Sequence, residues 1–232
     1  MRWMKRDLRP VANLYNDKTV DHFIAVKHAW AWQAVRHLRP SPRVLETNAG
    51  YGWLTVTYGT AGARVTAIDR DAAAVECLRI NTTGLETVCI HGDNKLIAER
   101  PLGPFDIIDI DATASPQPML DAVLHHYRPP ILFVTFGDVL HFRLNRGTEL
   151  KSGLARYGDT WRNHQHELTR GAQNFGEVIG FNYIRSAWPD AILSACHIWP
   201  MTGSTRLAVT LGTDLKLMTV DEAVVWSMVQ QQ

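Results

Sequence analysis

The stretch RVLETNAGYG, residues 43–52, joins an apolar, strand-like run to a turn that contains two glycines. Glycine lets the backbone take left-handed conformations and come close to a ligand, and a helix that begins after such a turn offers unpaired N–H groups. The spacing differs from the Gly-x-Gly-x-x-Gly of dinucleotide-binding turns. Glu46, at the end of the strand, would repel a phosphate and attract a cationic amine. The turn therefore predicts a ligand site for a molecule without a pyrophosphate.

Apolar runs rich in β-branched residues recur along the chain, with helix-like segments between them. This alternation is typical of βα units and a parallel sheet. The last two runs are joined by the short turn PMTGST and should pair antiparallel. We expect an α/β fold: a Rossmann-like, seven-stranded, mostly parallel sheet with helices on both faces and an antiparallel last strand. The expected strands are 43–47, 64–69, 87–91, 105–111, 131–136, 192–199 and 206–212.

Helix signals lie between these strands. Residues 20–38 have the pattern of one amphipathic helix, and the expected caps are Asp71, Ser115 before Pro116, and Thr219 with Glu222. Neither a repeat nor a Pro/Gly-rich linker divides the chain, so we expect a single domain over 1–232. Its parts are an N-terminal helical segment (1–42), a cofactor-binding core (43–138), a largely irregular insertion (139–165), a closing β-hairpin (192–212) and a C-terminal helix (219–230).

Composition excludes several classes of protein. With 46% hydrophobic and 20% charged residues, the 232-residue chain falls in the ordinary globular range. The longest apolar runs are too short to cross a bilayer, and the first residues contain no apolar signal segment. The three cysteines are scattered and form neither a disulfide framework nor a zinc motif. We expect a cytoplasmic protein with no membrane contact and no metal.

Acidic residues follow the ends of two more expected strands. Asp69 ends the second strand, where a carboxylate can accept hydrogen bonds from both hydroxyls of a ribose. Asp93 follows the third strand and can reach an adenine amine. Taken singly, Asp69 can also cap the next helix and Asp93 can close a turn. Because the carboxyl ends of parallel strands meet at one edge, the set favours a ligand with a ribose, an adenine and an amine, which describes S-adenosylmethionine.

The ordered segments ETNAGYG, AIDRD, HGDN and FDIIDID resemble those of class I S-adenosylmethionine-dependent methyltransferases, over residues 43–138 and the closing pair 192–212. Within that family, IDIDATASP is similar to the IDLDPFGSP segment of tRNA guanine-N2-dimethyltransferases. VTFGD and RINTTGL are similar to their VTATD and RN-x-x-x-NGL segments. The resemblance implies S-adenosyl-L-methionine as the cofactor. With the strand-end argument, it gives these cofactor-binding residues: Glu46, Asn48, Gly50, Gly52, Asp69, Arg70, Asp93 and Asn94.

The resemblance also assigns a catalytic role to Asp111, which matches the aspartate of the family's DPFG motif. An exocyclic amine is a weak nucleophile, and a carboxylate that accepts its N–H bonds can orient it and take up developing positive charge. We expect Asp106 to satisfy backbone N–H groups, and Asp109 to lie on the same face of the strand as Asp111.

The chain departs from the family pattern after Asp111, where Ala112 and Thr113 replace a proline and an aromatic residue that can stack on a base. A stacked base gains about 1–3 kcal/mol, so another aromatic residue would have to supply the platform. The candidates are Phe136, Phe142, Tyr157 and Trp161, each of which can also be a core residue. The larger relatives carry an additional C-terminal domain, for which this chain is too short.

Basic residues concentrate in two segments, 1–43 and 139–170, of a chain whose net charge is only +1. In the second of them, arginines alternate with aromatic residues, which suits RNA because cations bind phosphates and rings stack on exposed bases. A solvated surface is the alternative explanation. The expected substrate-binding residues are Arg143, Arg146, Arg156 and Arg162.

These features predict a methyltransferase that acts on a nucleic-acid base, with a guanine amine in tRNA as the first choice and RNA favoured over DNA. The alternatives are a DNA or small-molecule methyltransferase with the same cofactor site, and a binding module that has lost turnover.

Overall fold

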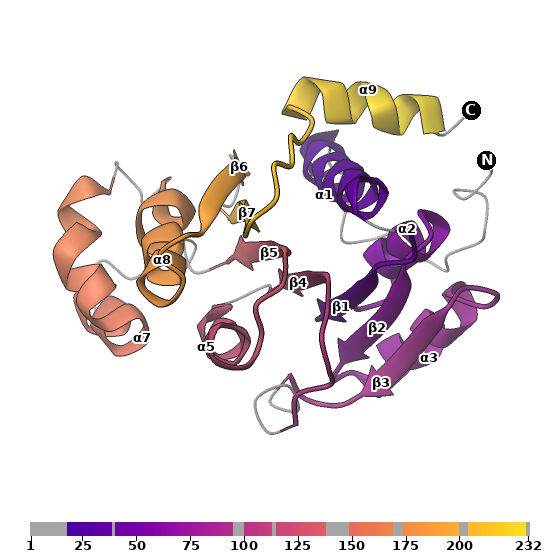
Figure 1. Ribbon diagram of the computed structural model, residues 1–232, viewed down its shortest axis with the longest axis horizontal. Helices are drawn as coiled ribbons and strands as arrows, with labels where there is room; N and C mark the ends of the chain where they lie inside the picture. The colour runs from indigo at the N-terminus through magenta and orange to yellow at the C-terminus, as the bar shows by residue number, and fades with distance from the viewer. Residues whose placement is uncertain are drawn as a thin grey trace.

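The structure, a computed structural model, describes residues 18–38, 40–94, 100–112, 115–137, 149–168, 174–199 and 204–230. Within these ranges, seven strands form one sheet in the order β3-β2-β1-β4-β5-β7-β6 (Figure 1). Their bounds are β1 Arg43–Thr47, β2 Arg64–Asp69, β3 Thr87–His91, β4 Ile107–Asp111, β5 Ile131–Phe136, β6 Ile192–Ile198 and β7 Thr205–Thr210.

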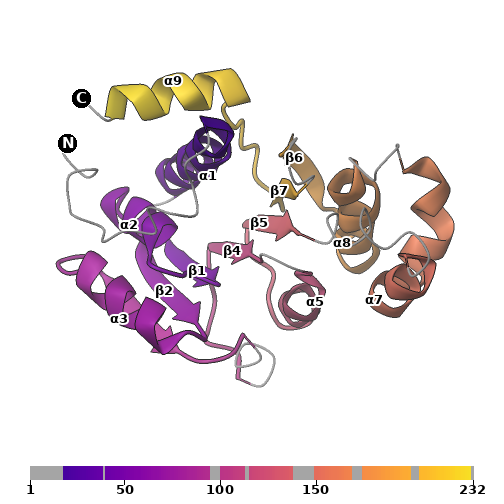
Figure 2. The same ribbon diagram turned by 180° about the vertical axis from the view of Figure 1, so that it is seen from behind.

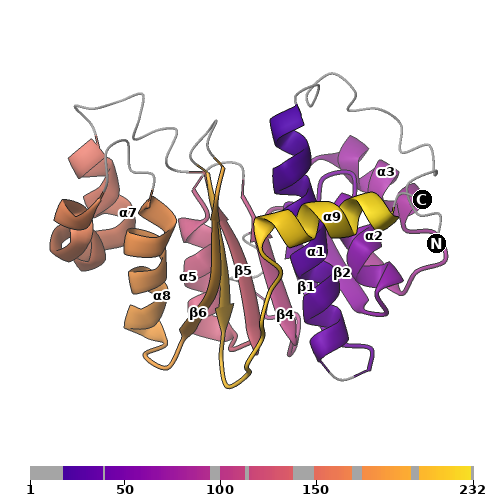
Figure 3. The ribbon, with the colours of Figure 1, turned by 90° about the horizontal axis from the view of Figure 1, so that it is seen from above.

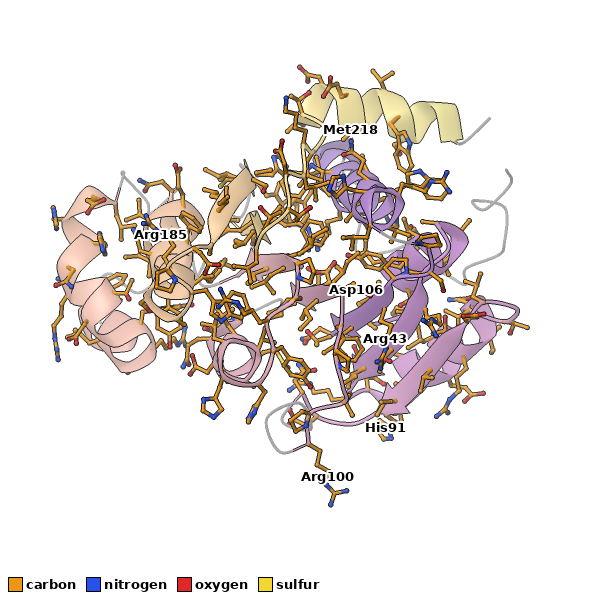
Figure 4. All side chains as sticks on the ribbon, in the orientation of Figure 1. Arg43, His91, Arg100, Asp106, Arg185 and Met218 are labelled. Carbon is orange, nitrogen blue, oxygen red and sulfur yellow. The ribbon has the colours of Figure 1, made fainter. Side chains whose placement is uncertain are left out.

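The pairing confirms the expected fold class. Strands β3, β2, β1, β4 and β5 pair in parallel with one another, whereas β7 is antiparallel to both β5 and β6. The prediction was wrong at the start of β4, which begins at Ile107 and not at 105. Asp106 there accepts a hydrogen bond from the Arg43 N–H (2.8 Å), as expected; both residues are labelled in Figure 4.

Helices cover both faces of the sheet (Figures 1 and 2). One apolar core lies between the sheet and the first set of helices, and a second core lies on the opposite face. The first set is α1 Lys18–His37, α2 Trp53–Thr60 and α3 Ala72–Asn81, with α9 Val220–Gln230 packed outside it. The second set is α5 Gln117–His126, α7 Glu149–His164, the short helices η2 Gln165–Glu167 and η4 Gly176–Phe181, and α8 Asn182–Ala187.

The C-terminal helix α9 lies across α1, on the side of α1 that faces away from the sheet (Figure 3). Trp30 of α1 donates from Nε1 to the carbonyl of Met218 (2.9 Å), and Trp32 packs against Trp226. Thr219 and Glu222 form the expected capping box at the start of α9, with 2.8 Å between the Thr219 N–H and Glu222 Oε2. These contacts fix α1, which contributes to the site described below.

The insertion was predicted to be largely irregular, and this was wrong for Glu149–His164, which forms helix α7 with a break at Gly158 (φ 51°, ψ −124°). Leu154, Tyr157 and Trp161 recur at helical spacing and pack into the second core. The prediction of an irregular segment rested on the arginines and histidines around these three residues. It did not use their apolar, helical spacing, which the sequence contains. Residues 138–148 lie outside the described residues.

The order of the strands creates a switch point between β1 and β4, from which the chain continues outward in both directions. In open α/β sheets, ligands bind beside the carboxyl ends of the strands at such a point. Here the register pairs Glu46 with Asp109 and, one strand further on, Asp111 with Thr135. In the described parts of the chain, no helix is long and apolar enough to cross a bilayer.

A buried histidine joins α1 to α2 close to this switch point. His28 is 5% exposed, and its Nδ1 lies 2.5 Å from the hydroxyl of Thr57. Burial, reinforced by the cations Lys27 and Arg206, lowers the pKa of His28 from 6.5 to about 4. The imidazole is therefore neutral in the folded protein at pH 7.

This lowered pKa predicts a loss of stability in acid. Below pH 6.5, His28 binds a proton in the unfolded chain but not in the folded protein. The free energy of unfolding that His28 contributes above pH 6.5 is therefore lost as the pH falls towards 4. The loss from this group is about 3 kcal/mol. Denaturant unfolding of wild type and His28→Asn should show wild-type stability falling by this amount relative to the variant between those pH values. Parallel pH profiles of the two proteins would contradict the prediction.

Candidate active site

The glycine turn between β1 and α2 requires left-handed backbone at three residues: Asn48 (φ 58°), Gly50 (φ 54°) and Gly52 (φ 86°). At Gly52 a Cβ atom would also lie 2.4 Å from Leu78 Cδ1, so packing excludes a side chain there. At Gly50 a Cβ atom would meet no atom of the described residues within 4 Å. The turn is thus close-packed against α3 at Gly52 and open at Gly50. The N-cap residue of α2 is Gly52, which has no side chain to accept from the first N–H groups of the helix.

Asp69, at the end of β2, holds this turn in place. Its Oδ2 accepts a hydrogen bond from the Gly50 N–H (2.7 Å), and its Oδ1 accepts one from the Asp71 N–H (2.9 Å). A carboxylate has about four acceptor positions, so Asp69 retains capacity for further donors. It is therefore placed to order the turn and to accept hydroxyl donors of a ligand at the same time.

The other expected cofactor-binding residues divide into two groups. Asn94, after β3, donates from Nδ2 to Asn48 Oδ1, which connects that loop to the glycine turn. Asp93 is exposed beside it. Arg70 is also exposed, and its carbonyl oxygen lies 3.1 Å from His91 Nε2. The structure thus joins Asn48, Gly50, Asp69 and Asn94 directly, and it places Arg70 and Asp93 at the margin.

Glu46 lies beneath the turn and not at its surface. Its side chain is 2% exposed and accepts a hydrogen bond from the Thr55 hydroxyl (2.6 Å). Burial raises the pKa of Glu46 well above its ordinary value. In this arrangement Glu46 supports α2 from below, and a role for its charge towards an amine of the ligand stays a prediction.

Asp111, at the carboxyl end of β4, forms an ion pair that the sequence did not suggest. Lys27 of α1 places Nζ 2.5 Å from Oδ1 and 2.6 Å from Oδ2 of Asp111. Burial alone would raise the pKa of Asp111, but Lys27 and then Arg206 lower it below its ordinary value. Asp111 is therefore an anion at neutral pH. Both side chains keep some exposure, 14% for Lys27 and 23% for Asp111.

A second, fully buried ion pair lies next to the first. Arg206 of β7 donates from Nη2 to Asp109 Oδ2 (2.6 Å) and from Nη1 to the Thr135 hydroxyl (3.0 Å). Tyr58 of α2 donates its hydroxyl to the same Asp109 oxygen (2.7 Å). Burial by itself would lower the pKa of Arg206, but Asp109 and Asp111 raise it above its ordinary value. Arg206 Nη1 lies 4.0 Å from Asp111 Oδ1, so one guanidinium serves both aspartates.

An aromatic ring of α1 lies against the partly buried Lys27–Asp111 pair, and two rings at the end of β6 pack on that ring. Lys27 Nζ lies 4.6 Å from the ring centre of Phe23, which stacks on Trp199 at 5.2 Å and lies 5.7 Å from the His197 ring. Three of the four residues proposed as a stacking platform are core residues instead: Phe136, Tyr157 and Trp161 are at most 5% exposed. The fourth, Phe142, lies outside the described residues.

The predicted substrate-binding arginines do not converge on this edge within the described chain. Arg156 is half-buried on α7, and exposed Arg162 pairs with Asp159 on the same helix. Figure 1 shows α7 at the opposite end of the molecule from α2 and α3. Arg143 and Arg146 lie outside the described residues. No cluster of three metal-ligating side chains occurs within the described ranges.

Sequence reasoning missed Lys27 and Arg206, although a signal for each was present. Lys27 is the single cation in the apolar run FIAVKHAW, and Arg206 opens the apolar run RLAVT. A cation within an apolar run indicates a buried charge with an anionic partner, and the aspartates of 105–111 indicate buried anions with cationic partners.

Comparisons with known proteins agree with this architecture. No protein-family model matches the sequence. A curated protein-L-isoaspartate O-methyltransferase from Methylorubrum populi is 40% identical over 84 residues, which span 35% of this chain and 39% of that protein. Trm1 from Pyrococcus horikoshii, solved with S-adenosyl-L-methionine, matches with a TM-score of 0.57 and 22% identity over 82% of this chain and 55% of Trm1.

Magnesium protoporphyrin IX methyltransferase from Synechocystis, solved with S-adenosylmethionine bound, matches with a TM-score of 0.51 and 14% identity over 82% of this chain and 80% of that enzyme. The sheet order and these likenesses define the class: the chain has the fold of class I S-adenosylmethionine-dependent methyltransferases, as its sequence motifs predicted.

The buried pair predicts an asymmetric response to mutation. Arg206→Met leaves Asp109 charged in the interior and should lower the free energy of unfolding by about 3–5 kcal/mol, whereas Asp109→Asn combined with Arg206→Met should recover most of that loss. Arg128→Met is the matched control, because it removes an exposed pair with Asp190, which solvent screens, and it should leave stability close to that of wild type. Urea denaturation measures all three, and equal small effects of the two arginine changes would contradict the prediction.

Proposed function

We propose that this chain is an S-adenosylmethionine-dependent methyltransferase that acts on a nucleic-acid base, with the exocyclic amine of guanine in tRNA as its substrate. The observation that carries the proposal is the ionised carboxylate of Asp111 at the carboxyl end of β4, beside a glycine turn that Asp69 ties to β2. This arrangement offers a ligand-binding turn and a proton acceptor at one edge of the sheet.

The residues at the turn fit the cofactor. Gly50 faces open space, Asp69 has acceptor positions left for ribose hydroxyls, and the start of α2 offers N–H groups. Asp93 and Asn94 follow the neighbouring strand on the side expected for an adenine. S-adenosylmethionine would supply an electrophilic methyl group next to the carboxyl end of β4.

Asp111 then orients the methyl-accepting amine and takes up its proton. Its carboxylate accepts N–H bonds from the exocyclic amine, which aligns the nitrogen with the methyl carbon about 3–3.5 Å away. As the nitrogen forms its bond to the methyl carbon and the carbon–sulfur bond breaks, the nitrogen becomes cationic and acidic. Asp111 takes the proton that the nitrogen loses and releases it to water. A lowered pKa is compatible with this role, because the cationic nitrogen is a much stronger acid than a carboxylic acid.

Two observations favour RNA as the substrate. IDIDATASP resembles a segment of tRNA guanine-N2-dimethyltransferases, and Trm1 matches over 82% of this chain. The chain spans 55% of Trm1 and the alignment spans 39% of the curated relative, so the substrate is our proposal and is not transferred from either protein.

Transfer of a labelled methyl group tests the function as a whole. The purified chain is incubated with labelled S-adenosylmethionine and, separately, with tRNA, DNA, a small-molecule extract and a protein mixture. We expect label in tRNA and, after digestion to nucleosides, in N2-methylguanosine. Label confined to any other fraction would replace the proposed substrate, and no label in any fraction would favour a binding module without turnover.

Asp69→Ala should weaken S-adenosylmethionine binding, because it removes two charge-assisted hydrogen bonds to the ribose worth about 1.5–3 kcal/mol each. Asp71→Ala is the matched control: it removes the N-cap of α3 from the same loop and should leave affinity close to that of wild type. Calorimetry measures both dissociation constants. Equal affinities of wild type and Asp69→Ala, with both folded, would remove Asp69 from the site.

Asp111→Asn keeps the shape of the side chain and removes its charge, so methyl transfer should fall by a factor on the order of 100 or more while cofactor affinity changes little. Asp106→Asn makes the same change at the other end of the same run, where an amide oxygen can still accept from the Arg43 N–H, and should preserve the rate. Single-turnover assays compare the three proteins. A wild-type rate for Asp111→Asn would show that Asp111 is structural.

A further inference from the structure

We propose that Lys27 determines which base the active site accepts, by donating a hydrogen bond to the carbonyl oxygen O6 of the guanine whose amino group Asp111 binds. The inference rests on the proposed function and adds a residue and an atom to it. Lys27 comes from α1, outside every motif that suggested a cofactor or substrate site.

The Lys27–Asp111 pair presents a specific pattern of hydrogen-bonding groups. Nζ is a donor, and it lies 2.5 and 2.6 Å from the two carboxylate oxygens, which are acceptors. One donor and two acceptors thus lie within the width of a base edge. Lys27 keeps 14% and Asp111 23% of their side-chain exposure, and in the structure Nζ covers both carboxylate oxygens.

Guanine is the base whose Watson–Crick edge complements this pattern in full. It offers O6 as an acceptor and both N1–H and the 2-amino group as donors, so Lys27 pairs with O6 while the two oxygens of Asp111 pair with the N–H groups. Adenine would place its 6-amino donor against the ammonium of Lys27. Cytosine would place two acceptors against the carboxylate. Uracil matches two positions, but it has no exocyclic amine to receive a methyl group.

Admission of the base requires Lys27 to move from the position where it now bridges both oxygens. Its side chain is a flexible four-carbon stem, and the Phe23 ring 4.6 Å from Nζ offers a second favourable contact for the cation. Asp111 stays in place when Lys27 moves, because the Thr135 hydroxyl is hydrogen-bonded to its carboxylate and Arg206 Nη1 lies 4.0 Å from Oδ1. The ammonium therefore yields the N–H positions and stays within reach of O6.

The test compares two synthetic tRNAs that are identical except at the methylated purine, which is guanine in one and 2,6-diaminopurine in the other. Both purines carry the 2-amino group, but diaminopurine has an amino donor in place of O6 and an unprotonated N1 in place of N1–H. The change at N1 meets Asp111 in every variant, so a change in the guanine preference when Lys27 is replaced reports on the O6 contact. Full-length wild type, Lys27→Met, Lys27→Arg and Lys27→Gln are assayed with S-adenosylmethionine for kcat/KM on each tRNA. Lys216→Met, which changes an exposed lysine in the segment before α9, is the matched control.

We expect wild type to prefer guanine over diaminopurine, and Lys27→Met to reduce this ratio by a factor on the order of ten or more, the discrimination typical of a specific base contact. Lys27→Arg keeps a cationic donor and should retain the preference, as should Lys216→Met. Thermal unfolding checks that each variant is folded. If Lys27→Met is not, Lys27→Gln, a neutral donor of shorter reach, should give an intermediate ratio.

The outcomes separate this inference from the function on which it rests. If wild type methylates the guanine tRNA and the ratio is unchanged in Lys27→Met and Lys27→Gln, or if both tRNAs lose rate equally, Lys27 only supports Asp111 and the inference is overturned. If wild type transfers no methyl group to the guanine tRNA, the proposed function fails and the role of Lys27 fails with it.

Discussion

The ion pair between Arg206 and Asp109 is the constraint on which the site depends. Both side chains are fully buried, and an unpaired charge in that position would cost several kcal/mol. The pair connects β7, the antiparallel strand, to β4 across β5, and Tyr58 adds α2 through the same carboxylate oxygen. Three elements from distant parts of the chain thus meet below Asp111, whose position and charge follow from this arrangement.

Arg206 links the buried Arg206–Asp109 pair to the partly exposed Lys27–Asp111 pair. Arg206 lies between Asp109 and Asp111 and helps to hold the pKa of Asp111 down, while Lys27 neutralises the charge on the open side. Helix α1 carries Lys27, Phe23 and His28. From outside, α1 is held by the Met218 carbonyl, just before α9, which accepts from Trp30 Nε1, and by Trp226 of α9, which packs on Trp32. A helix that precedes β1 in sequence thereby contributes the side chain that pairs with Asp111.

The sequence predicted most of the fold, because strands such as 43–47 and 131–136 are short, apolar and bounded by turn residues, and their order follows from βα alternation. It also placed Asp69 at the carboxyl end of β2 and the glycine turn after β1, as observed. It did not reveal the partners of Asp111, since Lys27 and Arg206 are 84 and 97 residues from Asp111 and Asp109, respectively, and the pairing depends on how β7 and α1 pack. The sequence placed Glu46 near the end of β1, but it did not show that this side chain is buried against Thr55 of α2.

The most direct measurement of the central claim is a crystal structure of the chain with S-adenosylhomocysteine and a guanine-containing RNA fragment. The account predicts the ribose hydroxyls on Asp69, the guanine 2-amino group on Asp111, and Lys27 Nζ withdrawn from the two carboxylate oxygens to O6. A cofactor product bound away from the glycine turn, or a base bound elsewhere while the Lys27–Asp111 pair stays closed, would contradict it.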